Sequence, residues 1–268
     1  MNDKEQRDLL IILLAAGAVL GWTLIARGDI SRDGAPLPIL SVNDLSRWAT
    51  IYSLAERGTY DIDETPFPTT IDRVRLNGHF YSSKPPLLPT LLTGEYLVLK
   101  TLSLGRLSFA RNAAAVIRVI VLTVNLVPFM VFLVLFARLL DRLAPDHWVR
   151  TYSLAAAAFG TYLTAFNITL NNHTIAAYSI FFALYAAYRI WCEGQTGARL
   201  FAVCGFFAAF AAVNEFPATS LLGALLAGLL WKHWRRTLMY FLPLALLPIA
   251  AHFLSLIHIS EPTRQAEI

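Results

Sequence analysis

Long apolar runs recur along the whole chain and indicate a membrane environment for it. The first run, from Leu9 to Ala26, contains no charged residue. At a helical rise of about 1.5 Å per residue, it would cross most of a hydrocarbon core roughly 30 Å thick. Of the 268 residues, 56% are hydrophobic and only 15% are charged, a balance that excludes an ordinary soluble domain. Further candidate spans, several of them short or interrupted, cover residues 112–137, 151–166, 174–191, 200–213, 218–231 and 238–253. The sequence therefore predicts an all-α, polytopic membrane protein with about seven transmembrane helices.

Charge and motifs exclude several classes of function. The 22 basic and 18 acidic residues leave a small positive excess, which is not typical of a nucleic-acid-binding protein. Cys192 and Cys204 provide neither a disulfide framework nor the spacing of a zinc site. The glycine-rich nucleotide motifs and the common hydrolase motifs are absent from the sequence, which argues against nucleotide hydrolysis and dinucleotide chemistry.

The last residues of the chain resemble translated adapter DNA more than natural protein sequence. The stretch LSLIHISEPTR, Leu254 to Arg264, resembles codon for codon the translation of a widely used transposase sequencing adapter, and the remaining residues fit the bases that follow it. We therefore expect residues 254–268 to be a sequencing artefact and the natural protein to continue past Phe253. Residues 1–253 would then be the N-terminal part of a transmembrane domain. The alternative is a natural amphipathic tail.

Charge bias predicts the topology. Lys4 and Arg7 precede the first run and place the N-terminus inside. A cleaved signal peptide is the alternative, but the small-residue cleavage site that it needs does not follow the run. Residues 86–104 are apolar overall but carry Glu95 and Lys100. If this segment lies along the membrane surface, every later basic residue that flanks a span falls on the cytoplasmic side. These residues are Arg138, Arg142, Arg150, Arg189, Arg199, Lys232, Arg235 and Arg236.

This topology leaves residues 27–111 as one long external loop with interfacial helices. The turn Asn167 to Thr174 and the turn around Asn214 and Glu215 then face the same external side. Asn172 and His173 in the first turn could contact an acceptor substrate or a metal ion, although a histidine in a loop is more often only solvated. Glu215 is either a functional acid or an exposed loop acid.

An amphipathic helix is predicted near the start of the external loop. Within Leu45 to Arg57, apolar residues recur at helical spacing, Asn43 or Asp44 could cap the helix, and Gly58 would end it. We expect this helix to lie at the membrane surface. Asp44 would sit at its N-terminus, where the helix dipole stabilises an ionised carboxylate. Asp44 is then either only a cap or a water-facing general base for a hydroxyl or amine nucleophile.

The stretch LNGHFYSSKPPLL, residues 76–88, carries the strongest local signal. Asn77-Gly78 predicts a tight turn between two short extended pieces. Pro85-Pro86 biases Lys84 toward an extended backbone and so fixes where its side chain points. An ammonium group presented in this way beside His79, Tyr81 and two serines suits a phosphate or pyrophosphate. The alternative is a polar loop that leads into an interfacial helix.

Two arginines in the next predicted helix could hold a second part of such a ligand. Arg111 and Arg118 are seven residues apart, so on a regular helix they lie within about 20° of the same face. Near the external interface, their paired donors could bind a lipid phosphate. The alternative is ordinary snorkelling of each side chain to the lipid headgroups.

Three of these features together carry a family resemblance. Asp44 with Arg47 at the head of a helix, -ERGTY- ending at Tyr60, and -NGHFYSSKPPLLP- at residues 77–89 resemble the GT-C glycosyltransferases. The most similar group is that of the protein O-mannosyltransferases and lipid A aminoarabinose transferases. In this group an acidic residue, a helix ending in Gly and a Lys-Pro-Pro motif occur in this order in the first external loop. The resemblance covers residues 40–90 well and the following helices by layout only.

The resemblance implies an integral enzyme of the bacterial inner (plasma) membrane, active on its external face. Such an enzyme takes a sugar from a polyprenyl-phosphate donor and passes it to a lipid, glycan or protein acceptor. The resemblance implies that Asp44 is the catalytic acidic residue and that Lys84 lies in the donor-phosphate region, with Arg47, His79 and Tyr81 as candidate substrate contacts. A divalent metal ion is a candidate cofactor that the sequence does not decide.

The expected reaction is a single in-line displacement. Lys84, Arg111 and Arg118 would neutralise the departing polyprenyl phosphate, and Asp44 would accept the proton of the acceptor. Two alternatives from other classes remain at this stage. One is a transporter or flippase of lipid-linked sugars, in which the same charges bind phosphate but no bond is made, and the other is a non-catalytic membrane subunit.

Overall fold

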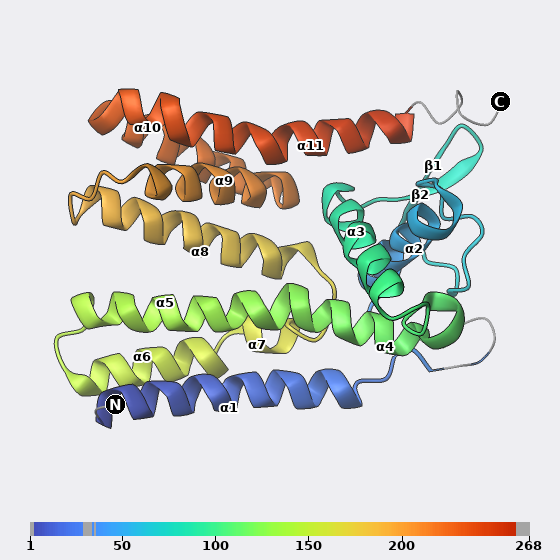
Figure 1. Ribbon diagram of the computed structural model, residues 1–268, viewed down its shortest axis with the longest axis horizontal. Coiled ribbons are helices and arrows are strands. Elements are labelled where there is room, and N and C mark those ends of the chain that lie inside the picture. The colour runs from blue at the N-terminus through green and yellow to red at the C-terminus, as the bar shows by residue number, and fades with distance from the viewer. Residues whose placement is uncertain (1–2, 29–33, 35, 261–268) are drawn as a thin grey trace. The chain divides into compact units, whose positions relative to one another are not determined.

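A computed structural model describes residues 3–28, 34 and 36–260 of the chain (Figure 1). Most of the described residues are helical, and the described strands form one two-stranded sheet, which confirms the expected all-α class. The chain divides into two compact units. The helical unit comprises residues 1–26 and 121–245, and the loop unit comprises residues 27–120 and 246–268. Residues 261–268, at the end of the stretch that resembles an adapter, lie outside the described residues.

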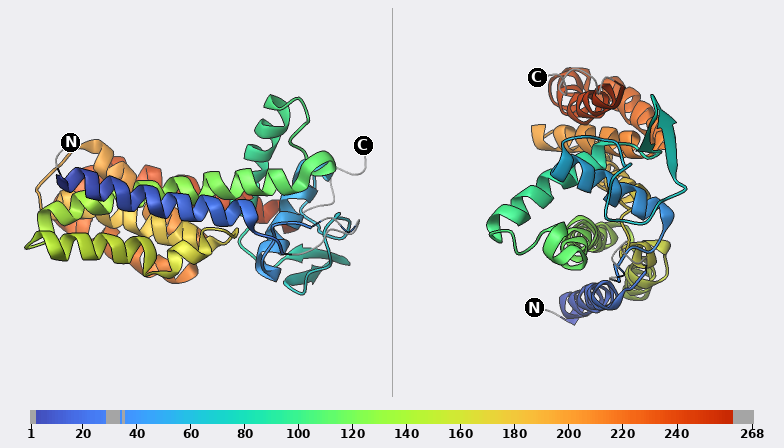
Figure 2. Two further views of the ribbon diagram at one scale, coloured as in Figure 1. Left: turned by 90° about the horizontal axis from the view of Figure 1, so that it is seen from below. Right: turned by 90° about the vertical axis from the view of Figure 1, so that its right-hand side faces the viewer.

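The helical unit consists of helices that lie alongside one another, as both side views show (Figures 1 and 2). Short π-helical turns, η1 and η3, and a 3-10 turn, η2, join some of them end to end. The elements are α1 Asp3–Ile25, η1 Leu122–Leu126, α5 Val127–Leu143, α6 His147–Phe159, α7 Tyr162–Phe166, α8 Asn172–Trp191, α9 Ala198–Asn214, η2 Phe216–Ala218, α10 Thr219–Arg236, η3 Thr237–Phe241 and the start of α11 Leu242–Ser260.

Three helical stretches among the described residues are long and apolar enough to cross a membrane. They are Asp3–Ile25, Phe109–Leu143 and Phe216–Ile259, and the shorter helix Ala198–Asn214 is also apolar. These stretches indicate a membrane protein by length and composition. The seven predicted spans are not confirmed.

The candidate span 151–166 is interrupted in the structure. α6 ends at Phe159, and the chain turns at Gly160 and Thr161 before the short helix α7 begins at Tyr162. A helix of 13 residues is about 20 Å long and falls short of a hydrocarbon core of roughly 30 Å. The stretch Phe216–Ile259 is also interrupted, because His233 has non-helical backbone angles and separates two helices.

Basic residues gather at one end of the helical unit, where α1 begins and where α5, α8 and α10 end (Figure 1). Lys4 and Arg150 both bind Asp141, and Arg142 pairs with Glu193 at 2.7 Å. The Lys232 ammonium donates to the carbonyl oxygen of Trp191 at 2.7 Å. The residues that the charge bias assigned to one side of a membrane therefore do share one end of this unit.

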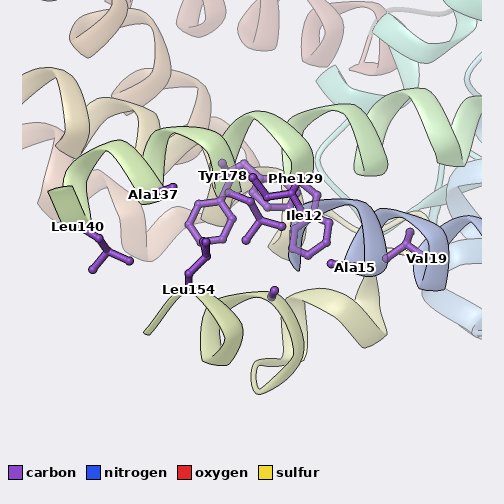
Figure 3. Close-up of a cluster of buried hydrophobic side chains, with 11 residues drawn as sticks. Ile12, Ala15, Val19, Phe129, Ala137, Leu140, Leu154 and Tyr178 are labelled. Atoms are coloured by element: carbon purple, nitrogen blue, oxygen red, sulfur yellow. The ribbon is translucent and has the colours of Figure 1, made fainter. Parts of the chain in front are cut away.

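An apolar core holds α1 against α5, α6 and α8 (Figure 3). Ile12, Ala15 and Val19 recur every three to four residues and so form one face of α1. This face packs against aromatic and aliphatic side chains of the neighbouring helices, of which Phe129 and Leu154 are fully buried. Burial of such side chains contributes about 1.5–3 kcal/mol each, so this cluster is a main source of the unit's stability.

The loop unit is built on α2 Val42–Arg57, with the hairpin β1 Arg73–Leu76 and β2 His79–Ser82, α3 Leu87–Leu102 and most of α4 Phe109–Val121. The predicted turn is confirmed: Asn77 and Gly78 both have positive φ, 50° and 91°, and join the antiparallel strands. Gly58 ends α2 in a left-handed conformation with φ 72°, as expected.

The position of α2 corrects one expectation. It begins three residues earlier than predicted, with Ser41 as its cap, and every residue from Asp44 to Ile51 is buried. Trp48 and Ile51 have no exposed surface, and Phe109 meets the Trp48 ring edge-on. Because every face is covered from Asp44 to Ile51, α2 is the core helix of the loop unit and not a helix with one side in water.

Candidate functional site

The predicted site residues fall into two groups, one in each unit. The loop unit holds Asp44, Arg47, His79, Tyr81, Lys84, Arg111 and Arg118, and the helical unit holds Asn172, His173 and Glu215.

Asp44 is part of the cap of α2. The Ser41 hydroxyl accepts a hydrogen bond from the Asp44 N–H at 3.1 Å, and Asp44 Oδ2 accepts one from the Leu40 N–H at 3.2 Å. This reciprocal arrangement satisfies two backbone donors at the helix start. Asp44 is 1% exposed, so the expectation of a water-facing carboxylate is wrong. The reason is the earlier cap, which moves Asp44 from the end of the helix into its first turn.

Arg47 lies one turn further along the same side of α2. It is also 1% exposed, and its Nη1 donates to the carbonyl oxygen of Asn43 at 2.8 Å. A guanidinium and a carboxylate three residues apart on a helix are neighbours, so the start of α2 carries a buried acid and a buried base. Substrate contact by Arg47 stays a prediction.

Lys84 does not extend freely from its loop. Its ammonium forms an ion pair with Asp72 Oδ1 at 3.1 Å, and the hydroxyl of Ser83 donates to the same oxygen. The Lys84 N–H donates to Ser82 Oγ at 3.2 Å, and Ser82 Oγ in turn shares a hydrogen bond with the buried hydroxyl of Ser46 on α2. The two serines of the -SSKPP- stretch therefore attach the lysine to Asp72 and to α2.

A small cavity lies beside Lys84, between α2 and the beginning of α3. Its lining combines hydroxyl groups and prolines, and it includes one residue of the stretch 254–268. The lining residues are Thr50, Tyr60, Tyr81, Ser82, Lys84, Pro86, Pro89 and Ile259. Tyr81 is 3% exposed, and burial together with the carboxylates of Asp61 and Asp63 raises its pKa. Its hydroxyl therefore stays protonated at neutral pH and is a donor.

His79 joins two acidic residues in an arrangement that could hold a divalent metal ion. One ligand atom of each of Asp61, Asp63 and His79 lies within 4.8 Å of the others. The side chains are already engaged, because His79 Nδ1 lies 2.7 Å from Asp63 Oδ2 and Asp61 accepts from Arg57 at 2.8 Å and from Thr59 at 2.7 Å. Burial would raise the pKa of Asp61, but the hydrogen bonds from Thr59 and Arg57 lower it. Arg57 thus already neutralises one of the two carboxylates that a metal ion would need.

Arg111 and Arg118 do not share a regular helix face, contrary to expectation. Asn112, between them, has φ −153° and ψ 67°, which breaks the helix. The side chain of Asn112 accepts a hydrogen bond from the Ala115 N–H at 3.1 Å and so starts a new helix after the break. The seven-residue spacing therefore no longer fixes the angle between the two arginines.

The helical unit brings its three candidate residues together. The Asn172 side-chain amide donates to the carbonyl oxygen of Asn214 at 2.8 Å and to Glu215 Oε1. His173 Nδ1 lies 2.7 Å from the same oxygen of Glu215. The start of α8 and the end of α9 are thereby joined by polar contacts. Their role as acceptor or metal contacts stays a prediction.

Sequence reasoning missed a buried asparagine beside this group. Asn125, in the π-helical turn η1, is fully buried and donates to the carbonyl oxygens of Asn167 and Thr169 at 2.9 and 2.7 Å. Tyr178 donates to Asn167 Oδ1 at 2.8 Å. An amide inside an apolar run was the available signal, because such a group is costly to bury without partners.

A second missed contact joins three elements of the loop unit. Buried Tyr96 of α3 donates its hydroxyl to Glu56 of α2 and accepts a hydrogen bond from the Phe109 N–H at 3.3 Å. Lys100 binds both oxygens of Glu56, at 2.9 and 2.8 Å. Burial raises the pKa of Tyr96, as does its bond to Glu56. Burial alone would raise the pKa of Glu56, but Lys100 and Tyr96 lower it.

Replacing Tyr96 by phenylalanine should destabilise the loop unit by about 1–3 kcal/mol, because it leaves the buried Phe109 N–H and one Glu56 bond unmade. Hydrogen exchange of the backbone amides of residues 36–120 in the detergent-solubilised chain, read by mass spectrometry, measures the change. Tyr162, which is 83% exposed, provides the matched control, since Tyr162→Phe removes the same hydroxyl from a solvated position. Equal stability of the two variants would contradict a supporting role for the Tyr96 hydroxyl.

Comparison of the chain with models of known families, with curated proteins and with solved structures finds no match to any of them.

Proposed function

We propose that the chain is a membrane glycosyltransferase that moves a sugar from a polyprenyl-phosphate donor to a lipid, glycan or protein acceptor. The observation that carries the proposal is the ammonium of Lys84, which the -SSKPP- stretch presents beside a cavity in the same unit as Asp44. The resemblance of residues 40–90 to the GT-C glycosyltransferases assigns the phosphate to Lys84 and the proton transfer to Asp44. Arg111 and Arg118 keep a proposed supporting role in phosphate binding.

In the proposed reaction the acceptor oxygen or nitrogen bonds to the anomeric carbon while the bond from that carbon to the phosphate oxygen breaks. The proton of the acceptor passes to Asp44, and the polyprenyl phosphate leaves with the bonding electron pair. Lys84 offsets the charge that develops on the phosphate. A single displacement of this kind inverts the anomeric centre.

Binding of a phosphate by Lys84 can be measured directly. Lys84→Met should weaken binding of farnesyl phosphate, a short polyprenyl phosphate, by about tenfold or more, because a charge-assisted bond contributes about 1.5–3 kcal/mol. Binding is measured with the chain in nanodiscs of phosphatidylcholine. Lys232→Met is the matched control, since Lys232 is exposed and donates to the Trp191 carbonyl oxygen. Equal affinity of the Lys84 variant and the unaltered chain would contradict the proposal.

A further inference from the structure

We infer that Asp72 binds the Lys84 ammonium when no ligand is present and thereby lowers the affinity of the phosphate site. An incoming phosphate monoester must compete with the Asp72 carboxylate for the lysine. The inference rests on the proposed function and adds a positioning residue that sequence reasoning did not single out. Asp72 acts through Lys84 and has no part in bond making.

The contacts of Asp72 make Lys84 its principal counter-ion. Its Oδ1 accepts from Ser83 and from the Lys84 ammonium, and Oδ2 is buried with no hydrogen-bond donor among the described residues. The side chains of Asp72 and Lys84 are 13% and 25% exposed, so water screens the pair only in part. A carboxylate that is half satisfied interacts strongly with the ammonium of Lys84.

The backbone of Asp72 is fixed, so the carboxylate can follow a departing lysine only by rotation of its own short side chain. Ser46 of α2 donates to the Asp72 carbonyl oxygen at 2.8 Å. The Asp72 N–H donates to Thr70 Oγ1 at 3.1 Å, and the same hydroxyl donates to the carbonyl oxygen of Val42 at 3.1 Å. Asp72 is thereby attached at two points to the first turns of α2.

The backbone of Lys84 is equally restricted, but its side chain is not. Pro85 and Pro86 limit the backbone, and the Lys84 N–H is bound to Ser82. The ammonium, in contrast, stands on a flexible four-carbon chain and has three donors. It can therefore turn from Asp72 toward the cavity that it lines. A phosphate bound by the turned ammonium still lies close to the Asp72 carboxylate and is repelled by it, so the pair lowers the affinity for a dianion.

Acylation of the lysines, read by mass spectrometry, tests the inference on the chain in phosphatidylcholine nanodiscs. The four lysines, Lys4, Lys84, Lys100 and Lys232, are measured separately. Asp72→Asn should raise the ligand-free acylation rate of Lys84 by about fivefold or more, since the counter-ion is lost. It should also lower, by a similar factor, the farnesyl phosphate concentration that protects Lys84 by half. Lys100, bound by Glu56, reports that the loop unit is folded and should not change.

Two further variants sharpen the test. Ser83→Ala removes the second donor to Asp72 Oδ1 without any change of charge, so Asp72 holds Lys84 more tightly. The ligand-free acylation rate of Lys84 should then fall, and the half-protecting concentration of farnesyl phosphate should rise. Glu64→Gln removes an equal charge from an exposed carboxylate of the same loop and should change neither quantity.

Inorganic phosphate distinguishes the source of the ligand. If it protects Lys84 at the same concentration as farnesyl phosphate, the site is assigned to a free phosphate. If protection needs a much higher concentration of inorganic phosphate, the site is assigned to a lipid phosphate.

The outcomes separate the inference from the proposed function. If farnesyl phosphate protects Lys84 but neither Asp72→Asn nor Ser83→Ala shifts the half-protecting concentration, the inference is overturned and the phosphate site stands. Weaker protection in Asp72→Asn also overturns it, since Asp72 would then orient the ammonium for the ligand. If neither phosphate protects Lys84 in any variant, the proposed function fails, and the inference fails with it.

Discussion

Replacing Arg150 by methionine should lower the free energy of unfolding of the helical unit by about 3–5 kcal/mol. Arg150 is 5% exposed and binds Asp8 of α1 through both terminal nitrogens, while its Nε donates to Asp141 of α5 at 2.8 Å. The variant leaves Asp8, whose side chain is only 14% exposed, as a largely buried carboxylate without its counter-ion. Removal of one partner from a buried ion pair is costly because the remaining charge has lost its solvation.

Unfolding of the purified chain in mixed detergent micelles measures the effect of Arg150→Met. Arg199→Met is the matched control, because Arg199 is exposed at the start of α9 and should change stability by less than about 0.5 kcal/mol. A double variant, Asp8→Asn with Arg150→Met, should recover part of the loss, since the uncompensated charge is removed. Similar stabilities for Arg150→Met and Arg199→Met would show that the Asp8 contact is not made in the membrane protein.

Replacing Asp44 by asparagine should reduce sugar transfer by about 10²–10⁴-fold, the usual contribution of a general base. Asparagine keeps the shape of the side chain and can still accept the hydrogen bond from the Leu40 N–H through its Oδ1, so the cap of α2 is preserved. Binding of farnesyl phosphate should remain, because the phosphate is assigned to Lys84 and not to Asp44. The measurement is transfer from a polyprenyl-phosphate sugar by the protein that carries this sequence, reconstituted in liposomes.

The liposome assay also separates the proposed enzyme from its main rival. A transferase consumes the lipid-linked sugar without moving it across the bilayer, whereas a flippase moves it without consuming it. Glu64→Gln, which neutralises an exposed carboxylate of the same loop, should retain full transfer. Transfer at the unaltered rate in Asp44→Asn would remove Asp44 from the reaction.

Several elements could be predicted from local sequence because their causes are local. Gly58 ends α2 and Asn77-Gly78 turns the hairpin, since each of these residues accepts a positive φ at little cost. The apolar runs identify helices because burial of a helix face needs apolar residues at its own period. The number of spans is less certain from runs alone, since a single glycine, Gly160, ends α6 within an otherwise apolar stretch.

Local patterns were misleading where one residue changed the backbone. Arg111 and Arg118 share a face only on an unbroken helix, and Asn112 breaks it by capping the next turn with its own side chain. A position at the N-terminus of a helix on the membrane surface predicts that Asp44 faces water. The cap at Ser41 and the segments that cover α2 bury it instead.

The sequence by itself determined the helical class, the hairpin, the end of α2 and the set of basic residues that gather at one end of the helical unit. Only the tertiary structure decided which charges meet. Arg150 and Asp8 are 142 residues apart, and Tyr96 reaches Glu56 across 40 residues. Lys84 meets Asp72 only because β2 pairs with β1 and both are attached to α2. The physical reason is that the periodicity of a sequence reports which face of a helix or strand is buried, whereas ion pairs depend on the path of the chain between those elements.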